Sequence, residues 1–375
     1  MKIVYCIQQI YNSGGMERVL ANKANYLSRN HDVTIITTDQ KHRQPFYKLS
    51  EDVTLIDLAI NYEDNQNRKS YLLKGICYFL NRIRHRRRLK KEMMQLKADV
   101  AISMFNQEVT ILPYLKDGSK KVLEFHFCRG SYHFSSNNTS LINRFLGKVE
   151  TYIYKDCKHD YDAFVVLTEE DKANWSEYAN VCAIPNARSF SVDSPATLDA
   201  KRVLAVGHYL PIKGFERLIY AWQKVNQVFP DWILSIVGEG PQRQFLQDII
   251  DKLGLTEHVI LEGVSYEIKR EYLTSSIFVM TSFSEGFSMT IIEAESAGLP
   301  VVSFNCPCGP KDIIQDGMDG FLVENGDIDG LADRIILLIQ DADLRKEMGG
   351  KAYMNSNRFS EVTVMTQWED LFHMI

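Results

Sequence analysis

Residues 278–305 read FVMTSFSEGFSMTIIEAESAGLPVVSFN. An apolar run at 278–280 predicts a short strand, and the polar loop after it carries Glu285 and Gly286. A helical pattern that contains Glu293 follows, and a Gly-Leu-Pro turn ends it before the next apolar run. This order of strand, loop, helix and strand is typical of an open α/β sheet, in which ligands bind at the carboxyl ends of the parallel strands.

Two features of this loop indicate the kind of ligand. The helix after it begins with unpaired backbone N–H groups and the positive end of the helix dipole, which together bind phosphate. Glu285 and Glu293 place two carboxylates near that phosphate site, and carboxylates accept hydrogen bonds from hydroxyl groups. A phosphate-linked, polyhydroxylated ligand such as a nucleotide sugar is therefore expected.

Alternating strand and helix patterns extend this unit over the chain. In the first half, strands are predicted at 2–7, 33–38, 53–58, 100–104, 121–125 and 163–167. In the second half, they are predicted at 203–206, 233–237, 259–261, 278–280, 301–304 and 321–323. Because strands and helices alternate, each series predicts a parallel sheet with helices on both faces.

The predicted fold class is α/β, with two Rossmann-like doubly wound domains that face each other across a cleft. The length of 375 residues suits two domains of ordinary size. A polar, proline-marked stretch at 184–195 predicts a linker between them. We place the first domain at residues 1–188, the second at 198–358, and an amphipathic helix at 359–375.

Composition excludes several classes of protein. Hydrophobic residues make up 45% of the chain, as in soluble globular proteins, and the net charge of −5 argues against general affinity for nucleic acid. The seven cysteines are scattered apart from Cys306 and Cys308, so we expect free thiols and no metal site. We expect no signal peptide, because Gln8 and Gln9 interrupt the short apolar run at the start of the sequence. No apolar stretch approaches the ~20 residues that span a bilayer. We therefore expect a cytoplasmic protein.

Two more loops of the second half follow predicted strands. The first reads GHYLPIKG at 207–214 and carries Lys213, a cation suited to phosphate. The second reads GEG at 238–240, where glycine lets the backbone approach a ligand closely. An isolated lysine is usually a solvated loop cation, and a lone G-x-G is weak evidence. Their positions after parallel strands favour a binding role over these alternatives.

The first half offers two comparable positions. Gly14 and Gly15 lie in the first loop between strand and helix, where glycine allows close backbone approach. The alternative is an ordinary tight turn in which Glu17 complements the helix dipole. His126 follows the strand at 121–125. It is either a hydrogen-bonding group of the fold or part of the cleft.

Together these residues resemble a known enzyme family. The segments SEGF at 284–287, EA at 293–294 and GLPVV at 298–302 resemble the E-x7-E signature of the retaining glycosyltransferases of family 4, which have the GT-B fold. The family usually has G-R-x-x-x-x-K-G where this chain has 207–214, so His208 stands in place of an arginine. In the family the terminal helix returns to the N-terminal domain, and we expect the same here.

The resemblance implies transfer of a sugar from a nucleotide-diphosphate donor, with UDP expected on family frequency, to a hydroxyl of a glycan acceptor. Glu293 would accept hydrogen bonds from the ribose, and Glu285 from the donor sugar. Lys213 and the N–H groups of 286–289 would stabilise charge on the leaving diphosphate. The catalytic candidates are Glu285, His126 and Lys213. The donor-binding candidates are Gly14, Gly15, Gly207, His208, Lys213, Gly238, Glu239, Gly286, Phe287, Ser288, Met289 and Glu293.

No D-x-D motif is present, so we expect no metal ion and no cofactor, with the nucleotide sugar as co-substrate. Three alternatives remain open: a nucleotide-sugar isomerase of similar architecture, a glucan phosphorylase, and a catalytically inactive nucleotide-sugar-binding protein. Glu293 also has a local alternative, because Thr290 and Glu293 have the spacing of a helix capping box.

A basic stretch lies in the first half. Residues 67–97 contain six Arg and five Lys against one Glu, a net charge of +10, with aromatic and aliphatic residues between them. A basic amphipathic helix of this kind binds anionic membrane surfaces, although most charge runs are solvated helix faces. We expect a peripheral position on the inner face of the membrane and a lipid-linked acceptor from a cell-surface polysaccharide pathway.

Overall fold

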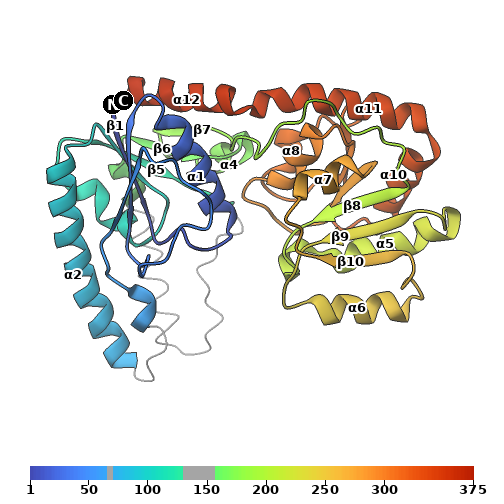
Figure 1. The fold of residues 1–375 in the computed structure, drawn as a ribbon, viewed down its shortest axis with the longest axis horizontal. Helices are drawn as coiled ribbons and strands as arrows, with labels where there is room; N and C mark the ends of the chain where they lie inside the picture. Colours follow the sequence, from blue (N-terminus) through green and yellow to red (C-terminus); the bar gives the residue numbers. More distant parts are fainter. Residues whose placement is uncertain (66–70, 130–156) are drawn as a thin grey trace.

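The computed structural model describes residues 1–65, 71–129 and 157–375, and it contains two parallel sheets (Figure 1). The first sheet has the strand order β3-β2-β1-β4-β5-β6-β7, and the second has the order β10-β9-β8-β11-β12-β13. The recorded strand pairs are parallel. The α/β class predicted from the sequence is confirmed.

The first half contains the first sheet. Its strands are β1 (Lys2–Ile7), β2 (Asp32–Thr37), β3 (Val53–Asp57), β4 (Val100–Ser103), β5 (Lys120–Glu124), β6 (Ala163–Val166) and β7 (Val181–Ala183). Its helices are α1 (Gly15–Leu27), α2 (Tyr71–Leu96) and α4 (Glu169–Asn174).

The second half contains the second sheet. Its strands are β8 (Arg202–Val206), β9 (Ile233–Val237), β10 (Val259–Gly263), β11 (Ile277–Met280), β12 (Val301–Phe304) and β13 (Gly320–Val323). Its helices are α5 (Phe215–Val228), α6 (Arg243–Lys252), α7 (Ile268–Leu273), α8 (Met289–Ser296), α9 (Pro310–Ile313), α10 (Ile328–Gln340) and α11 (Ala342–Asn355). The chain ends in α12 (Glu361–Met374).

The twelve strands predicted from the sequence all have counterparts in the structure. Strand β7 was not predicted, because it has only three residues, none of them fully buried, at the edge of its sheet. Strand β1 shows why the other patterns were clear. Ile3, Tyr5 and Ile7 belong to the core on one face of the sheet, while Val4 and Cys6 belong to the core on the other face. A strand buried on both faces is a continuous apolar run.

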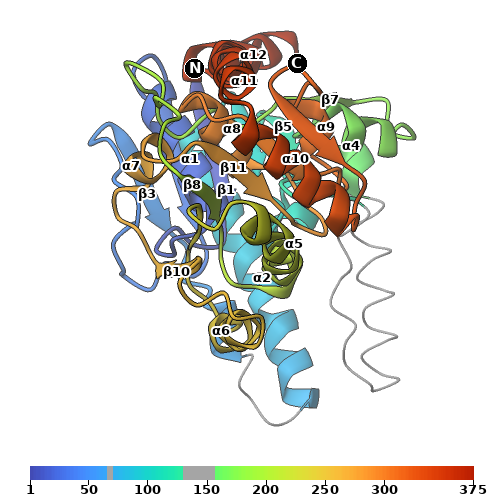
Figure 2. The ribbon, with the colours of Figure 1, turned by 90° about the vertical axis from the view of Figure 1, so that its right-hand side faces the viewer.

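The last helix joins the two halves of the molecule. Trp368 and Phe372 of α12 belong to the same core cluster as Ile3 of β1, whereas Met348 of the preceding helix α11 belongs to a core cluster of the second half. Figures 1 and 2 show α11 and α12 along the same side of the molecule, ending where both chain termini lie. The chain therefore crosses back to the first half at its end.

Helix α2 carries most of the basic stretch; residues 67–70 of that stretch lie outside the described residues. Figure 1 shows α2 on the outer side of the first sheet, away from the second half. Among the described residues, no helix combines the length and apolar character needed to cross a membrane.

Candidate functional site

Lys213 and Glu285 lie together where two strands of the second sheet end. Lys213 closes a short 3-10 turn after β8, and Glu285 lies in the loop between β11 and α8. The Lys213 Nζ donates to Glu285 Oε1 at 2.7 Å, and the Ser282 hydroxyl donates to the same oxygen. Lys213 is therefore a held cation, and the solvated-cation alternative does not describe it.

The glycines of the neighbouring loops are required by close backbone contacts. Gly238 has a φ of 152°, and a Cβ atom there would lie 1.9 Å from the carbonyl oxygen of Gly207. Gly214 has a φ of 60°, and a Cβ atom there would lie 2.4 Å from the carbonyl oxygen of Thr281. Glycine is the residue that adopts such positive φ values at low cost. These contacts bring the loops after β8, β9 and β11 together.

Helix α8 begins at Met289, with Ser288 at the N-cap position and no side-chain cap. The capping-box alternative for Glu293 is therefore wrong, because Thr290 lies inside the helix instead of capping it. The Ser288 hydroxyl is buried and has no hydrogen-bond partner among the described residues. A buried hydroxyl at the positive end of a helix is a suitable group for an incoming anion.

Glu293 is buried and is held from both halves of the molecule. The Tyr272 hydroxyl donates to Glu293 Oε2 at 3.0 Å. The Arg18 Nη1 of α1 donates to Glu293 Oε1 at 3.3 Å. Burial, followed by the charge of Glu293, raises the pKa of Tyr272 well above its usual value, so the phenol keeps its proton and donates. Glu293 thus faces the point where α1 and α8 meet.

His126 follows β5, and its backbone lies against Gly286 of the second half. A Cβ atom at Gly286 would lie 2.1 Å from the His126 carbonyl oxygen. The His126 ring is nearly buried, with Nε2 2.9 Å from Glu124 Oε1, although this nitrogen lacks the alignment of a hydrogen bond. The structure therefore places the backbone of His126 at the candidate site and its ring beside Glu124.

Glu124 and Lys23 form a buried ion pair behind His126. The Lys23 Nζ donates to both oxygens of Glu124 at 2.7 Å, and it lies 3.5 Å from the centre of the Trp368 ring. Burial alone would raise the pKa of Glu124, but Lys23 and then His126 outweigh it and leave the pKa at about 2. The buried pair of Lys23 and Glu124 thus anchors the end of β5, from which the loop that carries His126 begins.

The remaining candidates occupy simpler positions. Gly14 is the N-cap of α1, and the space over Gly15 is open within 4 Å of a Cβ atom there. Glu17 accepts from Gln9 and folds back toward Gly14, as the tight-turn alternative requires. His208 is exposed. Glu239 makes an exposed pair with Arg243 at 3.2 Å.

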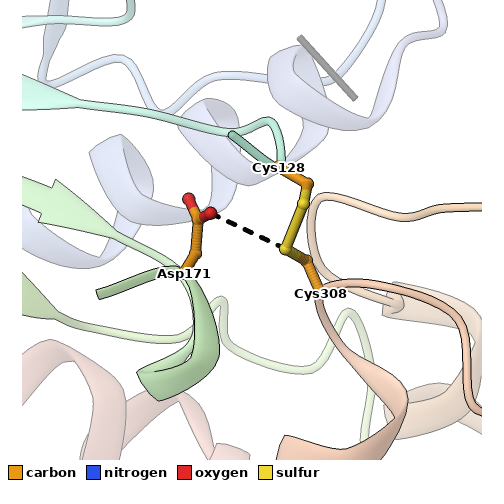
Figure 3. A group of neighbouring side chains, drawn as sticks. All are labelled: Cys128, Asp171 and Cys308. Atoms are coloured by element: carbon orange, nitrogen blue, oxygen red, sulfur yellow. Dashed lines mark hydrogen bonds between the residues drawn. A yellow bond between two sulfur atoms is a disulfide. The ribbon is translucent and has the colours of Figure 1, made fainter. Parts of the chain in front are cut away.

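The cysteines contradict the expectation of free thiols. Cys128 of the first half and Cys308 of the second form a disulfide with a Cα–Cα distance of 5.8 Å (Figure 3). Asp171 Oδ1 lies 3.6 Å from the Cys308 sulfur. These three residues are the one group in the described part of the chain with the spacing of metal ligands, but here the two sulfurs are bonded to each other. Because 180 positions separate the cysteines, only the packing of the halves reveals the pair.

Sequence reasoning also missed Arg18 and Tyr272, the two donors to Glu293. Arg18 belongs to the GGMER segment that drew attention only for its glycines. Tyr272 lies in α7, outside every motif. A search for cations and phenols beside predicted strand ends would have found Arg18 and would still have missed Tyr272.

Two family profiles match the chain. The profile described as Glycosyl transferases group 1 matches residues 188–354, and the profile described as Glycosyltransferase Family 4 matches residues 13–188. An uncharacterized glycosyltransferase of Haemophilus influenzae is 29% identical over 378 residues, covering 99% of each chain. The amylovoran biosynthesis glycosyltransferase AmsD of Erwinia amylovora is 27% identical, also covering 99% of each chain.

A third relative comes from Campylobacter jejuni. It is named as an α-1,4-N-acetyl-D-galactosaminyltransferase that acts on a diNAcBac-PP-undecaprenol-linked glycan, and it is 28% identical, covering 98% of this chain and 97% of its own. Among solved structures, a mutant of S. aureus TarM in complex with fondaparinux, α-GlcNAc-glycerol and UDP has a TM-score of 0.78 at 18% identity, covering 99% of each chain. This likeness shows that the fold is GT-B.

Proposed function

We propose that this chain, which belongs to the group 1 glycosyl transferases of glycosyltransferase family 4, transfers a sugar from a nucleotide-diphosphate donor to a hydroxyl of a glycan acceptor with retention of anomeric configuration. The observation that carries the proposal is the placement of Lys213, Glu285 and Glu293 around the amino end of α8. A cation, a helix N-terminus and two carboxylates together suit a diphosphate that links two hydroxyl-bearing sugars.

Each group has a distinct role in the proposed donor complex. Lys213 and the amino end of α8, with the Ser288 hydroxyl, bind the diphosphate and stabilise its charge as the sugar leaves. Glu293 accepts hydrogen bonds from the ribose, while Tyr272 holds its other oxygen. Glu285 accepts hydrogen bonds from the donor sugar. The UDP bound in the TarM structure supports UDP as the first nucleotide to test.

We also propose that the reaction requires no metal ion. Lys213 supplies a fixed positive charge beside the helix dipole, and these two can neutralise a leaving diphosphate without Mg²⁺. Measuring the reaction in the presence of a chelator tests whether a metal ion is required. Activity that persists in excess EDTA supports the proposal, whereas activity that needs added Mg²⁺ or Mn²⁺ contradicts it.

The acceptor proposed is a lipid-linked glycan of a cell-surface polysaccharide pathway. The names of the Campylobacter and Erwinia relatives support this class. Helix α2 supports it too, because Ile76, Phe79 and Leu80 are exposed among its cations. Each surface cation adds about 1 kcal/mol of attraction to an anionic leaflet. The protein would thus lie against the membrane on the outer side of the first sheet.

Vesicle binding tests the membrane proposal. The variant Arg86→Glu/Arg87→Glu should lose binding to vesicles of phosphatidylglycerol and phosphatidylcholine at low salt. The control Lys252→Glu/Lys269→Glu makes the same change of charge on exposed lysines of the second half and should retain binding. Equal binding of both variants, or none by the wild type, would remove the proposed membrane surface.

Donor binding tests the function itself. A nucleotide sugar at 100 times its dissociation constant should raise the stability of the wild type by ~2.7 kcal/mol in EDTA. The variant Glu293→Gln should lose the effect. The control Glu347→Gln, which removes an exposed carboxylate paired with Lys351 within α11, should keep it. Transfer of the labelled sugar to an acceptor, as opposed to isomerisation of the donor or binding alone, separates a transferase from a nucleotide-sugar isomerase and from an inactive binding protein.

A further inference from the structure

Arg18 lies where the two halves meet and pairs with a residue proposed to bind the donor. It lies near the beginning of α1 in the first half, while Glu293 belongs to α8 in the second half. The Nη1···Oε1 distance is 3.3 Å, and the side chain of Arg18 is 30% exposed whereas that of Glu293 is 4% exposed. Figure 1 shows α1 on the side of the first sheet that faces α8.

Arg18 contacts the same carboxylate, that of Glu293, that is proposed to accept hydrogen bonds from the ribose. Tyr272 donates to Oε2 and Arg18 donates to Oε1, so each oxygen of the buried Glu293 already has a donor in the structure. The contact with Arg18 joins a single guanidinium nitrogen to a single carboxylate oxygen at a long distance. A bidentate Arg–carboxylate pair would be shorter and stronger. The Arg18 contact is therefore the one that a ribose hydroxyl can displace.

The proposed diphosphate lies about one helical turn from Glu293, toward the amino end of α8. Glu293 lies four positions after Met289, the first residue of α8, which corresponds to about 6 Å of helix rise. A turn of the Arg18 side chain along α8 brings it toward the amino end, where the diphosphate is proposed to lie. The space over Gly15 on the same helix as Arg18 is open, so the first half leaves room for a phosphate there.

The loop after β8 offers the proposed diphosphate few positive charges, so a further cation is needed to bind it. Position 208 carries an exposed histidine, and Lys213 is a point charge already shared with Glu285. An arginine adds a planar fork of N–H donors that matches two phosphate oxygens. Arg18 is a cation of the first half that contacts the donor site directly.

We infer that Arg18 is a positioning residue that exchanges partners: it holds Glu293 until a nucleoside diphosphate binds, and it then turns to the diphosphate. This inference rests on the proposed function. Donor binding then frees Glu293 for the ribose and draws the first half onto the donor. The exchange couples occupation of the site to the contact between the two halves.

Calorimetric titration of UDP and of uridine separates this role from a structural one. In Arg18→Met, which removes the charge and keeps the length, UDP should bind about tenfold to hundredfold more weakly, the loss expected for a charged hydrogen bond. Uridine has no phosphate, so its affinity should stay equal or increase as Glu293 is released. Arg18→Lys should restore part of the UDP affinity.

The control Arg29→Met removes another arginine of the first half that pairs with an acidic residue far along the chain, Glu361 at 3.8 Å. It should leave both affinities unchanged. An unchanged ratio of UDP to uridine affinity in Arg18→Met overturns the inference, whether both affinities stay the same or both fall by the same factor. A wild type that binds no nucleoside diphosphate, including GDP, overturns the proposed function instead.

Discussion

The two carboxylates of the candidate site are held in different parts of the molecule. Glu285 is bound by Lys213, and both belong to the second half. Glu293 is bound by Tyr272 from the second half and by Arg18 from the first. One part of the proposed donor site is therefore complete within the second half, whereas the other part depends on how the two halves meet.

The interface between the halves has further contacts close to the same place. The His126 carbonyl oxygen lies against Gly286, and two residues later Cys128 is bonded to Cys308. Glu170 of α4 receives a hydrogen bond from the Cys308 backbone N–H at 3.0 Å. The loop after β5 and helix α4 of the first half therefore both contact the second half close to α8.

The largest effect is a loss of stability, expected when the buried ion pair of Glu124 and Lys23 behind the His126 loop is broken. Glu124→Gln leaves the Lys23 charge buried without a partner, which should lower the free energy of unfolding by about 3–5 kcal/mol in urea denaturation. Because the pKa of Glu124 falls from 4.5 to about 2 on folding, its contribution is present above pH ~4.5 and lost as pH falls toward 2.

The control for this prediction is Glu347→Gln, which removes an exposed pair with Lys351 within one helix. It should change stability by only about 0.3–0.5 kcal/mol. A Glu124→Gln protein as stable as this control would show that the ion pair does not fix the His126 loop.

The next effect tests the part of the site that lies within the second half. Lys213→Ala should lower kcat by about 10²–10³-fold, because a fixed charge that stabilises the leaving group is lost. Lys346→Ala removes an exposed lysine paired with Asp199 and should change kcat little. Activity of Lys213→Ala within a few-fold of the wild type would remove Lys213 from the diphosphate site.

The disulfide tests the interface directly. Because it links residues 180 positions apart, reduction should lower stability by about 2–4 kcal/mol, and the two halves should then unfold in separate steps. Urea denaturation of the wild type with and without a small dithiol measures this. Cys128→Ser should match the reduced protein under both conditions, while Cys77→Ser, which changes a free cysteine of α2, should respond to reductant as the wild type does. Identical curves for oxidised and reduced wild type would contradict a stabilising bridge.

The smallest of these effects concerns the backbone contact between the two halves at Gly286. Gly286→Ala would place a Cβ atom 2.1 Å from the His126 carbonyl oxygen, so the loops must separate. A displacement of about 1 Å at a reacting site costs about 10²-fold in rate, so kcat should fall by about that factor. Gly350→Ala adds a Cβ atom in open space and should be neutral. An unimpaired Gly286→Ala enzyme would show that the halves need not approach so closely.

The difference between the two regions also explains what could be predicted. Lys213 and Glu285 follow neighbouring parallel strands, β8 and β11, and the carboxyl ends of such strands lie at one edge of the sheet. Strand patterns alone therefore brought them together. The buried, continuous apolar runs of these strands made the patterns clear.

The contacts between the halves could not be derived in this way. Arg18 and Glu293 lie 275 positions apart, and no local pattern specifies how two separate sheets are placed. The same reason hid the disulfide and the approach of His126 to Gly286. The capping-box alternative failed for a local reason, since α8 begins one residue before Thr290 with Ser288 at the N-cap.

A crystal structure of the protein with UDP in the presence of EDTA tests the central claim most directly. We expect ribose hydroxyls within about 3.2 Å of Glu293, the diphosphate at Lys213 and the amino end of α8, and Arg18 moved from Glu293 to a phosphate oxygen. A nucleotide bound elsewhere, or one bound while the Arg18–Glu293 contact stays intact, would contradict it.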